Sequence, residues 1–363
     1  MNRISTVPIN DTKKWDQIVT SFTQHDVYYL SGYVKAFQTH GDGTPYLFLY
    51  ESDALRCINV AMKQDIASIT QLKDFLPPAT YYDLMTPYGY GGFLFEGEIT
   101  HETLFEFKDA YSQYMQTNNI VSEFVRYHPI LKNATTASTI FPVINKGETA
   151  YMDLATSELI WANMKPNSRN NIRKAEKSAI KIEHSNDPAL YKEFKVMYNE
   201  VMQKNEASSY YYFEDEFYAS IQQNLQNNSE VFYALYENRI IAMSLFIYAN
   251  KQLHCHLLCS STAHRRYAPS NLLLYEAACW GFKNGMKTMH LGGGLGYRDD
   301  DLLRFKQTFN KNSNLIASIG TNIYIQEIYD RLVDKQNANH MVSSQQEKNT
   351  FFPLFRYQST LEE

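Results

Sequence analysis

Two stretches of the sequence repeat the same order of elements, and this duplication limits the folds open to the chain. The first stretch predicts strands at 45–50 and 55–62, a helix at 102–115 and a strand at 120–127. The second predicts strands at 231–236, 240–248 and 252–260, a helix at 271–284 and a strand at 288–291. Because a hairpin precedes each helix, the pattern favours an α+β fold over strict βαβ alternation.

The duplication and the length of 363 residues predict two domains. We expect a first domain over residues 1–150, completed by the C-terminal segment 320–363, and a second domain over 151–320. The Asn/Gln-rich stretch 333–350 predicts a linker. The apolar residues 351–356 should then dock back on the body of the protein.

Charge and cysteine content exclude several classes of protein. The net charge of −5 disfavours a general nucleic-acid binder, although a local basic patch is compatible with it. The four cysteines form no pair of CxxC motifs, so we expect neither a structural zinc site nor a disulfide scaffold. The sequence has no apolar run of about 18 residues. A cytoplasmic protein is expected, with peripheral docking on a membrane left open.

A glycine run and the charged segment after it are the first candidate site. Gly292, Gly293 and Gly294 follow a predicted strand, where glycine is costly unless the backbone approaches something closely. The run lacks the spacing of a dinucleotide fingerprint. Aspartates at 299–301 predict a helix start with Lys306 one or two turns inside, where its ammonium group can neutralise an oxyanion. A tight turn and a surface lysine are the alternatives, and we expect no metal.

Two basic segments are candidate anion sites. Arg265 and Arg266 precede the helix that starts near Asn271, and a helix N-terminus can hold a phosphate. Arg169, Arg173 and Lys177 share one face of a predicted helix at i, i+4 and i+8. Surface arginines beside a capped helix and a solvated charged face are the respective alternatives.

Aromatic and histidine side chains complete the candidates. Tyr88 and Tyr90 flank Gly89 in a loop of the first repeat, where they can line a cleft or pack at an interface. His256 lies on a predicted strand facing the helix start at Asn271, and a buried structural histidine is the alternative. No Ser-His-Asp or Cys-His arrangement can be assembled from the sequence.

Several motifs, in this order, resemble the Fem-type peptidoglycan aminoacyltransferases and the related acetyltransferase-like (GNAT) proteins. The match is strongest over 165–309 and weaker over 26–92. The matching segments are Arg169-Asn-Asn-Ile-Arg-Lys-Ala175, Met202–Ala207 with Tyr210–Phe213, Asn271–Leu274, Trp280–Gly285, His290–Gly294 and Asp300–Lys306.

The resemblance implies two tandem GNAT-like domains without a coiled-coil arm. It also implies transfer of an aminoacyl group from a charged tRNA to an amine of a cell-wall precursor, with the amine as nucleophile and no cofactor. The residues that it assigns to catalysis are Lys306 and Phe305. With the candidates from the residues themselves, the expected substrate-binding residues are Lys35, Tyr88, Tyr90, Lys204, Tyr211 and His256. The expected donor- or anion-binding residues are Arg169, Arg173, Lys177, Arg265, Arg266, Asn271, Gly292, Gly293 and Gly294.

Two departures keep other functions open. Lys204 stands where members usually carry an arginine, and a lysine cannot make the same bidentate contact. Arg265–Asn271 lies where the wider superfamily binds a pyrophosphate, but Ala268 and Ser270 replace glycines. An N-acyltransferase that uses an acyl-coenzyme A such as acetyl-CoA on a small amine or amino sugar is therefore one alternative. A non-catalytic binding module is the other.

Overall fold

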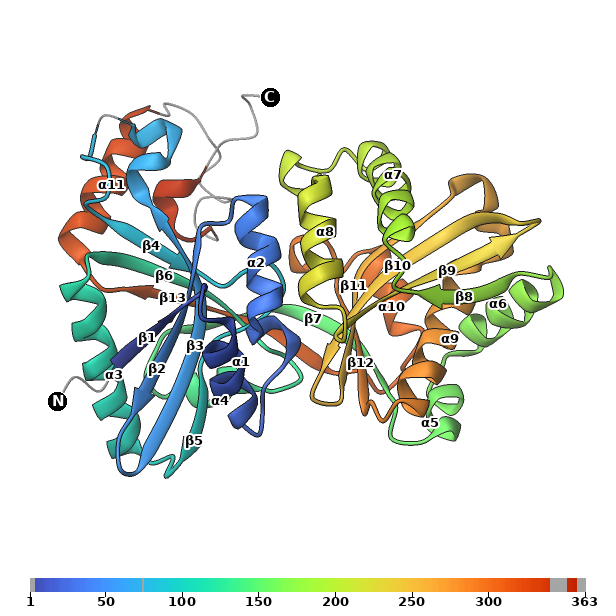
Figure 1. Cartoon of the computed structure of the whole chain (residues 1–363), viewed down its shortest axis with the longest axis horizontal. Helices are drawn as coiled ribbons and strands as arrows, with labels where there is room; N and C mark the ends of the chain where they lie inside the picture. Colours follow the sequence, from blue (N-terminus) through green and yellow to red (C-terminus); the bar gives the residue numbers. More distant parts are fainter. Residues whose placement is uncertain (1–3, 74, 340–350, 358–363) are drawn as a thin grey trace. The chain divides into compact units, whose positions relative to one another are not determined.

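The computed structural model describes residues 4–73, 75–339 and 351–357 and divides into two compact units (Figure 1). The first unit is built from 1–23, 41–145 and 318–363, and the second from 24–40 and 146–317. These bounds differ from the expected domains at residues 24–40, which belong to the second unit. The reason is that α2 (Ser31–His40) packs along α8 (Asp215–Asn224) of that unit.

Seven strands form the sheet at the centre of the first unit. Its strands, in spatial order, are β1 (Ile4–Pro8), β2 (Thr44–Glu51), β3 (Leu55–Asp65), β4 (Tyr82–Met85), β6 (Ile120–Tyr127) and β13 (Leu315–Ile323), and β5 (Leu94–Gly97) pairs with β3. Neighbours are antiparallel except β4 and β6, which are parallel. The helices are α1 (Thr12–Ser21), α3 (His101–Thr117), α4 (Asn133–Ala137) and α11 (Gln326–Asn339).

Aromatic side chains dominate the core of the first unit. Helix α3 starts with a capping box at Thr100 and buries Phe107, Tyr111 and Met115 against the sheet. A smaller core joins α11 to the C-terminal segment, where Phe355 is fully buried. The expected docking of 351–356 is therefore confirmed. The expected linker is wrong as far as residue 339, because that part continues α11, and 340–350 lie outside the described residues.

The second unit has a six-stranded sheet. Its order is β7 (Val143–Asp153), β12 (Thr288–Gly293), β11 (Gln252–Ser260), β10 (Arg239–Ala249), β9 (Ser229–Tyr236) and β8 (Lys181–Ser185). Helices α5 (Ser157–Ala162), α6 (Pro166–Lys177) and α9 (Pro269–Lys283) cover one face (Figure 1). Helices α7 (Pro188–Lys204) and α8 cover the other, and the short α10 (Asp301–Gln307) packs on β12.

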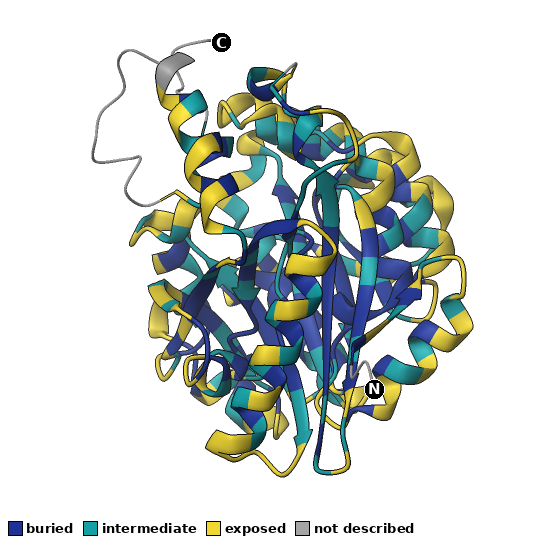
Figure 2. Ribbon diagram, turned by 90° about the vertical axis from the view of Figure 1, so that its left-hand side faces the viewer, coloured by how far each residue is buried: buried dark blue, intermediate teal, exposed yellow. Residues whose placement is uncertain are grey.

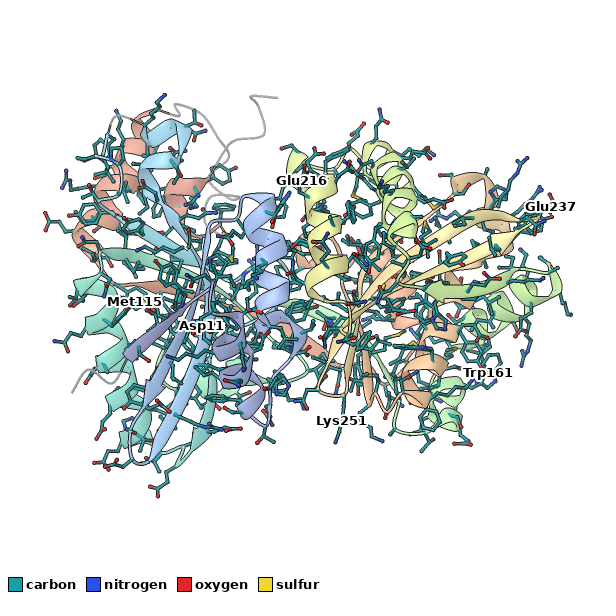
Figure 3. The ribbon with its side chains drawn as sticks, viewed as in Figure 1. Asp11, Met115, Trp161, Glu216, Glu237 and Lys251 are labelled. Atoms are coloured by element: carbon teal, nitrogen blue, oxygen red, sulfur yellow. The ribbon has the colours of Figure 1, made fainter. Side chains whose placement is uncertain are left out.

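Local sequence explains the elements of the second unit. The turns at Glu237 and Lys251 have positive φ angles, as two-residue hairpin turns require, and both stand at the tips of hairpins (Figure 3). Helix α9 is buried on most of its surface, and Gly285, with φ +80°, follows its end as predicted. The strands of the protein are largely buried, while most helices expose one face (Figure 2).

The longest helices in the described part of the chain, α3 and α7, have 17 residues each, and no coiled-coil arm occurs there. None of the helices so described is long and apolar enough to cross a membrane.

Candidate active site

The two parallel strands of the second unit separate after a short paired stretch. β11 and β12 pair only at Gln252–Thr288, Leu253–Met289 and His254–His290. Beyond this point β11 continues to Ser260 beside β10, and β12 continues to Gly293 beside β7. The carboxyl ends of parallel strands are where ligands bind in many α/β sheets. We call the region where these strands part the split.

Each strand carries a β-bulge at the split. Cys255 and Leu257 have partners on β10 but His256 has none, and Leu291 is skipped in the pairing of β12 with β7. The hydroxyl of Ser244 closes the first bulge by donating to Leu257 O at 2.9 Å. Bulges bend a strand and redirect side chains, and they are frequent beside active sites. The strands therefore diverge because both are irregular at the same level.

Lys306 lies at the split. It is the sixth residue of α10, and its Nζ donates to the carbonyl oxygen of Gly293 at 2.7 Å. Burial lowers the pKa of Lys306, and this effect is only partly opposed by Cys255 and Asp300. Phe305 packs its half-buried ring against the core beside Phe309 and holds α10 in place. An ammonium with two N–H bonds not used by any described partner can stabilise a developing oxyanion.

The glycine run has a steric explanation. Gly292 has φ +80°, and a Cβ there would lie 3.3 Å from Lys306 Nζ. At Gly294 a Cβ would lie 2.1 Å from Arg298 O, so any larger residue would displace the loop. Asp300 accepts hydrogen bonds from Leu295 N and Leu303 N, which ties this loop to the first turn of α10. The glycines thus allow α10 to return towards β12 and deliver Lys306.

Arg265 and Arg266 lie just beyond the carboxyl end of β11, in a 3₁₀ helix, Thr262–Tyr267. Both are exposed, and Arg266 donates to the hydroxyl of Tyr267 at 2.8 Å. Asn271 is buried in the first turn of α9. A compact helical turn therefore occupies the segment for which the sequence resemblance implied a pyrophosphate-binding loop.

The basic helix α6 is joined to the end of α10. Lys165 N donates to Thr308 O at 2.8 Å, and the hydroxyls of Ser168 and Thr308 are 2.6 Å apart. Arg169 follows in the first turn, and Arg173 stacks over the ring of Trp161 at 5.2 Å. Lys177 is exposed at the last position of the helix, about 12 Å along the axis from Arg169.

Four residues expected to meet substrate lie on or beside the other face of the sheet, where α7 and α8 pack. The ring of His256 packs 5.7 Å from that of Tyr33 on α2. Lys35 is half-buried on the same helix, and Lys204 is exposed at the end of α7. Tyr211 is exposed beside Tyr210, whose ring lies 4.9 Å from that of His40. Burial lowers the pKa of His256 to about 3, so its imidazole is neutral near pH 7.

Tyr88 and Tyr90 belong to the first unit, in the loop after β4, where the ring of Tyr90 lies 5.8 Å from that of His128. The parallel pair of that unit, β4 and β6, does not separate as β11 and β12 do. Its pairing runs from Tyr82 through Met85, and Gly91 bonds to Arg126 farther along. The two repeats thus differ at the feature that creates the split.

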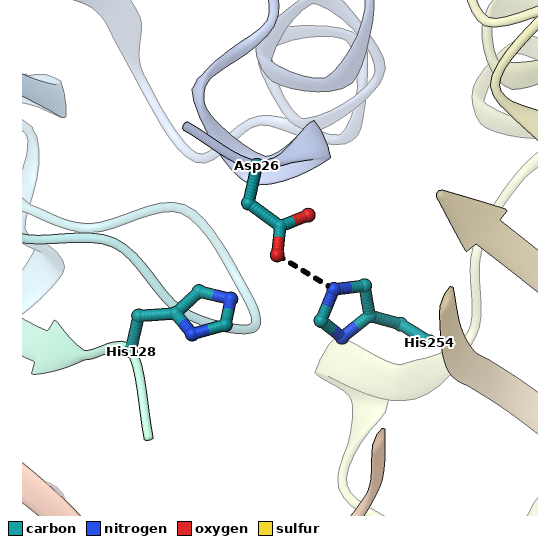
Figure 4. A group of neighbouring side chains, drawn as sticks. All are labelled: Asp26, His128 and His254. Atoms are coloured by element: carbon teal, nitrogen blue, oxygen red, sulfur yellow. Dashed lines mark hydrogen bonds and ion pairs between the residues drawn. The ribbon is translucent and has the colours of Figure 1, made fainter. Parts of the chain in front are cut away.

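The sequence did not predict two features of the site. Cys255 lies close enough to Lys306 to affect its pKa, while burial raises the pKa of the Cys255 thiol and keeps it protonated. Asp26 forms a buried hydrogen bond with His254, at 2.9 Å between Oδ2 and Nε2 (Figure 4). The partners are 228 residues apart, and no local pattern signals such a contact.

We compared the sequence and the fold of the chain with those of known proteins. Residues 162–307 match the acetyltransferase (GNAT) domain family. The structure resembles that of FemX, with a TM-score of 0.67 and 13% identity over 90% of this chain and 99% of FemX. It also resembles a conserved protein of unknown function from Bacteroides thetaiotaomicron, with a TM-score of 0.57 and 11% identity over 89% of this chain and all of that one (100%).

A third similar structure is a C-terminal domain from Agrobacterium fabrum assigned to a lysylphosphatidylglycerol synthetase. Its TM-score is 0.52, and its identity is 13% over 89% of this chain and 96% of that domain. A sequence search of curated proteins gives no match.

Residues 162–307 are therefore similar to the acetyltransferase (GNAT) domain. The chain as a whole has the FemX fold. The α+β fold class expected from the sequence, with GNAT-like units, is confirmed.

Proposed function

We propose that the chain is an acyltransferase that forms an amide bond, with the aminoacyl group of a charged tRNA as donor and an amine of a peptidoglycan precursor as acceptor. The observation that carries this proposal is the position of Lys306. Its half-buried ammonium group lies at the split between β11 and β12, bonded to Gly293 O. A cytoplasmic location follows from such a donor.

The chemistry needs charge stabilisation but no protein nucleophile. The acceptor nitrogen attacks the ester carbonyl carbon, the C–N bond forms, and the C–O bond to the tRNA ribose breaks. The amine loses a proton and the ribose hydroxyl gains one. Negative charge develops on the carbonyl oxygen in between, and Lys306 would bond that oxygen. The protonated thiol of Cys255 agrees with direct attack by the amine.

The basic helix α6 supports a polyanionic donor. Arg169, Arg173 and Lys177 lie on a helix whose start is bonded to Thr308, directly after the helix that carries Lys306. Cations spaced along one helix suit a phosphate backbone, because phosphate contacts supply most of the sequence-independent affinity for nucleic acid. We assign the donor to this side of the sheet. We assign the acceptor to Lys35, Lys204, Tyr211 and His256 of the second unit.

An acyl-coenzyme A donor is the second candidate, and the split itself favours it. Separated strands leave backbone groups with which an extended pantetheine arm can pair, and α9 begins beyond the end of β11. Against it stands the compact turn Thr262–Tyr267, in which Arg266 is already bonded to Tyr267. The acceptor would then be a small amine or amino sugar.

The donor can be tested with the purified chain. Amide formation would be followed by mass spectrometry with charged tRNA and a soluble muramyl-pentapeptide precursor, and in parallel with acetyl-coenzyme A and amino sugars. The proposal predicts product only with charged tRNA. Turnover with acetyl-coenzyme A alone would contradict the proposal and support the second candidate function. If neither donor gives product, the alternative of a non-catalytic binding module is supported.

The role of α6 can be tested separately. The double variant Arg169→Gln/Arg173→Gln should raise the KM for charged tRNA at least about tenfold, because two phosphate contacts are lost. Arg239→Gln/Lys251→Gln is the matched control, since both of these cations are exposed in hairpin turns of the same unit. Equal KM values for the two double variants would show that α6 does not bind the donor.

A further inference from the structure

A polar cavity of about 480 Å³ opens in the first unit, at the ends of β2 and β3. Its wall includes Thr44, Lys63, Asp65, Thr70 and Arg356. All of its lining residues belong to the first unit, so the cavity is independent of the residues assigned to acyl transfer in the second. Its volume falls in the range of small-molecule sites, about 300–1,000 Å³.

Lys63 is a half-buried cation in the wall of this cavity. It lies opposite Thr44 in the pairing of β2 with β3, so the two side chains share one face of the sheet. Its Nζ is 3.6 Å from the ring centroid of Tyr82 and 5.4 Å from that of Tyr46. Burial lowers the pKa of Lys63, and the negative charge of Asp65 opposes this effect only in part.

The acidic groups nearby are already engaged. Asp65 accepts from Ala67 N at 3.0 Å and from Ala79 N at 2.8 Å, one bond to each oxygen. The buried Asp83 binds Arg356 through two hydrogen bonds, of 2.5 and 2.7 Å. This pairing uses Nε and Nη2 of Arg356 and leaves Nη1 without a described partner. The wall of the cavity therefore offers an ammonium group, a guanidinium nitrogen and threonine hydroxyls.

We propose that this cavity binds a phosphate-bearing small molecule, held by Lys63 and Arg356 and by the hydroxyl groups of Thr44 and Thr70. A phosphoryl group has three or more acceptor oxygens and carries charge, so it satisfies several donors at once. A carboxylate offers only two oxygens and would leave donors unused. This inference goes beyond acyl transfer and does not depend on it.

The cavity is also linked to the C-terminal segment. Arg356 is carried by residues 351–357, which are fixed by the burial of Phe355 and by a bond from Leu354 N to the hydroxyl of Tyr329. A ligand bound to Arg356 binds only the docked form of this segment. Ligand binding should therefore raise the melting temperature of the first unit, as binding to the native state alone requires.

Calorimetric titration of the full-length chain with inorganic phosphate, pyrophosphate and acetate tests the site. One saturable site for phosphate and for pyrophosphate is expected, with no saturable binding of acetate. Lys63→Gln should weaken pyrophosphate binding by about tenfold or more, since it removes a charge-assisted hydrogen bond. Lys73→Gln changes an exposed lysine outside the cavity and should leave binding unchanged.

Each variant is first checked for an unaltered melting temperature without ligand. If Lys63→Gln fails to fold, Thr44→Val takes its place, because it keeps the shape and removes one hydroxyl donor, and severalfold weaker binding is expected. Absence of saturable phosphate and pyrophosphate binding overturns the proposal. Equal affinity of Lys63→Gln, or of Thr44→Val where it is used, and the unmodified chain also overturns it.

Discussion

Asp26 Oδ2 and His254 Nε2 are hydrogen-bonded at 2.9 Å, and the two side chains are 0% and 1% exposed. His254 is the last residue of β11 that pairs with β12 before the split. The pair therefore fixes the segment 24–40 against the strand at the level where the candidate active site begins. Helix α2, which carries Lys35, follows directly in that segment.

Removal of the Asp26 carboxylate should destabilise the second unit. Asp26→Ala removes the carboxylate that is hydrogen-bonded to Nε2 of the buried His254, and the loss of a buried hydrogen-bond partner costs about 1–3 kcal/mol of unfolding free energy. The measurement is urea denaturation followed by tryptophan fluorescence. Glu193→Ala, an exposed carboxylate on α7, is the control and should change stability by less than about 0.5 kcal/mol. Equal midpoints for the two variants would show that the pair contributes nothing.

Substitution by alanine should have different effects at Gly294, in the glycine run, and at Gly285, after the end of α9. Gly294→Ala would place a Cβ 2.1 Å from Arg298 O, so the loop before α10 must move and displace Lys306. Gly285→Ala also acts at positive φ, but a Cβ there meets nothing within 4 Å, and the cost should be about 1 kcal/mol. We expect loss of acyl transfer for Gly294→Ala and nearly full activity for Gly285→Ala. Similar kcat values for both would contradict the steric explanation.

Local signals in the sequence predicted much of the second unit. The hairpins around Glu237 and Lys251, the helix ended by Gly285 and the cap at Asp300 all depend on neighbours along the chain. The position of Lys306 one or two turns into a capped helix followed from the same local pattern.

The split could not be predicted, because it results from register shifts at His256 and Leu291 on strands that are not adjacent in sequence. The placement of residues 24–40 in the second unit was missed for a related reason. It depends on the contact between Asp26 and His254 and on the packing of α2 against α8. The sequence of α2 contains no pattern that identifies the helix against which it packs.

The pH dependence of acyl transfer should report on Lys306. Burial lowers the pKa of this lysine from its usual value of 10.5, and the charged form exists only below that pKa. The rate should therefore fall on the alkaline side at a pH below 10.5. Lys306→Arg should lack this alkaline limb, because arginine stays charged, while its overall rate is reduced by the altered geometry. A limb that persists unchanged in Lys306→Arg would assign the titration to another group.

The C-terminal segment should contribute to the stability of the first unit. Phe355→Ala removes a fully buried ring and should lower the free energy of unfolding by about 3–5 kcal/mol. Phe351→Ala is a matched control in the same segment, because its side chain is 43% exposed, and its effect should stay below about 1 kcal/mol. Chemical denaturation of both variants measures the difference. An equal loss for the two would mean that Phe355 does not anchor the segment.

The central claim is that Lys306 stabilises the oxyanion of acyl transfer. Its most direct test is the kcat of Lys306→Met, which keeps an apolar stem, compared with that of Lys311→Met. Lys311 also donates to a backbone carbonyl, Ala162 O at 3.3 Å, but it is exposed. With the active donor, Lys306→Met should lose about 10²–10³-fold in kcat at an unchanged melting temperature, and Lys311→Met should lose almost nothing. A kcat for Lys306→Met equal to that of the unmodified chain would contradict the mechanism.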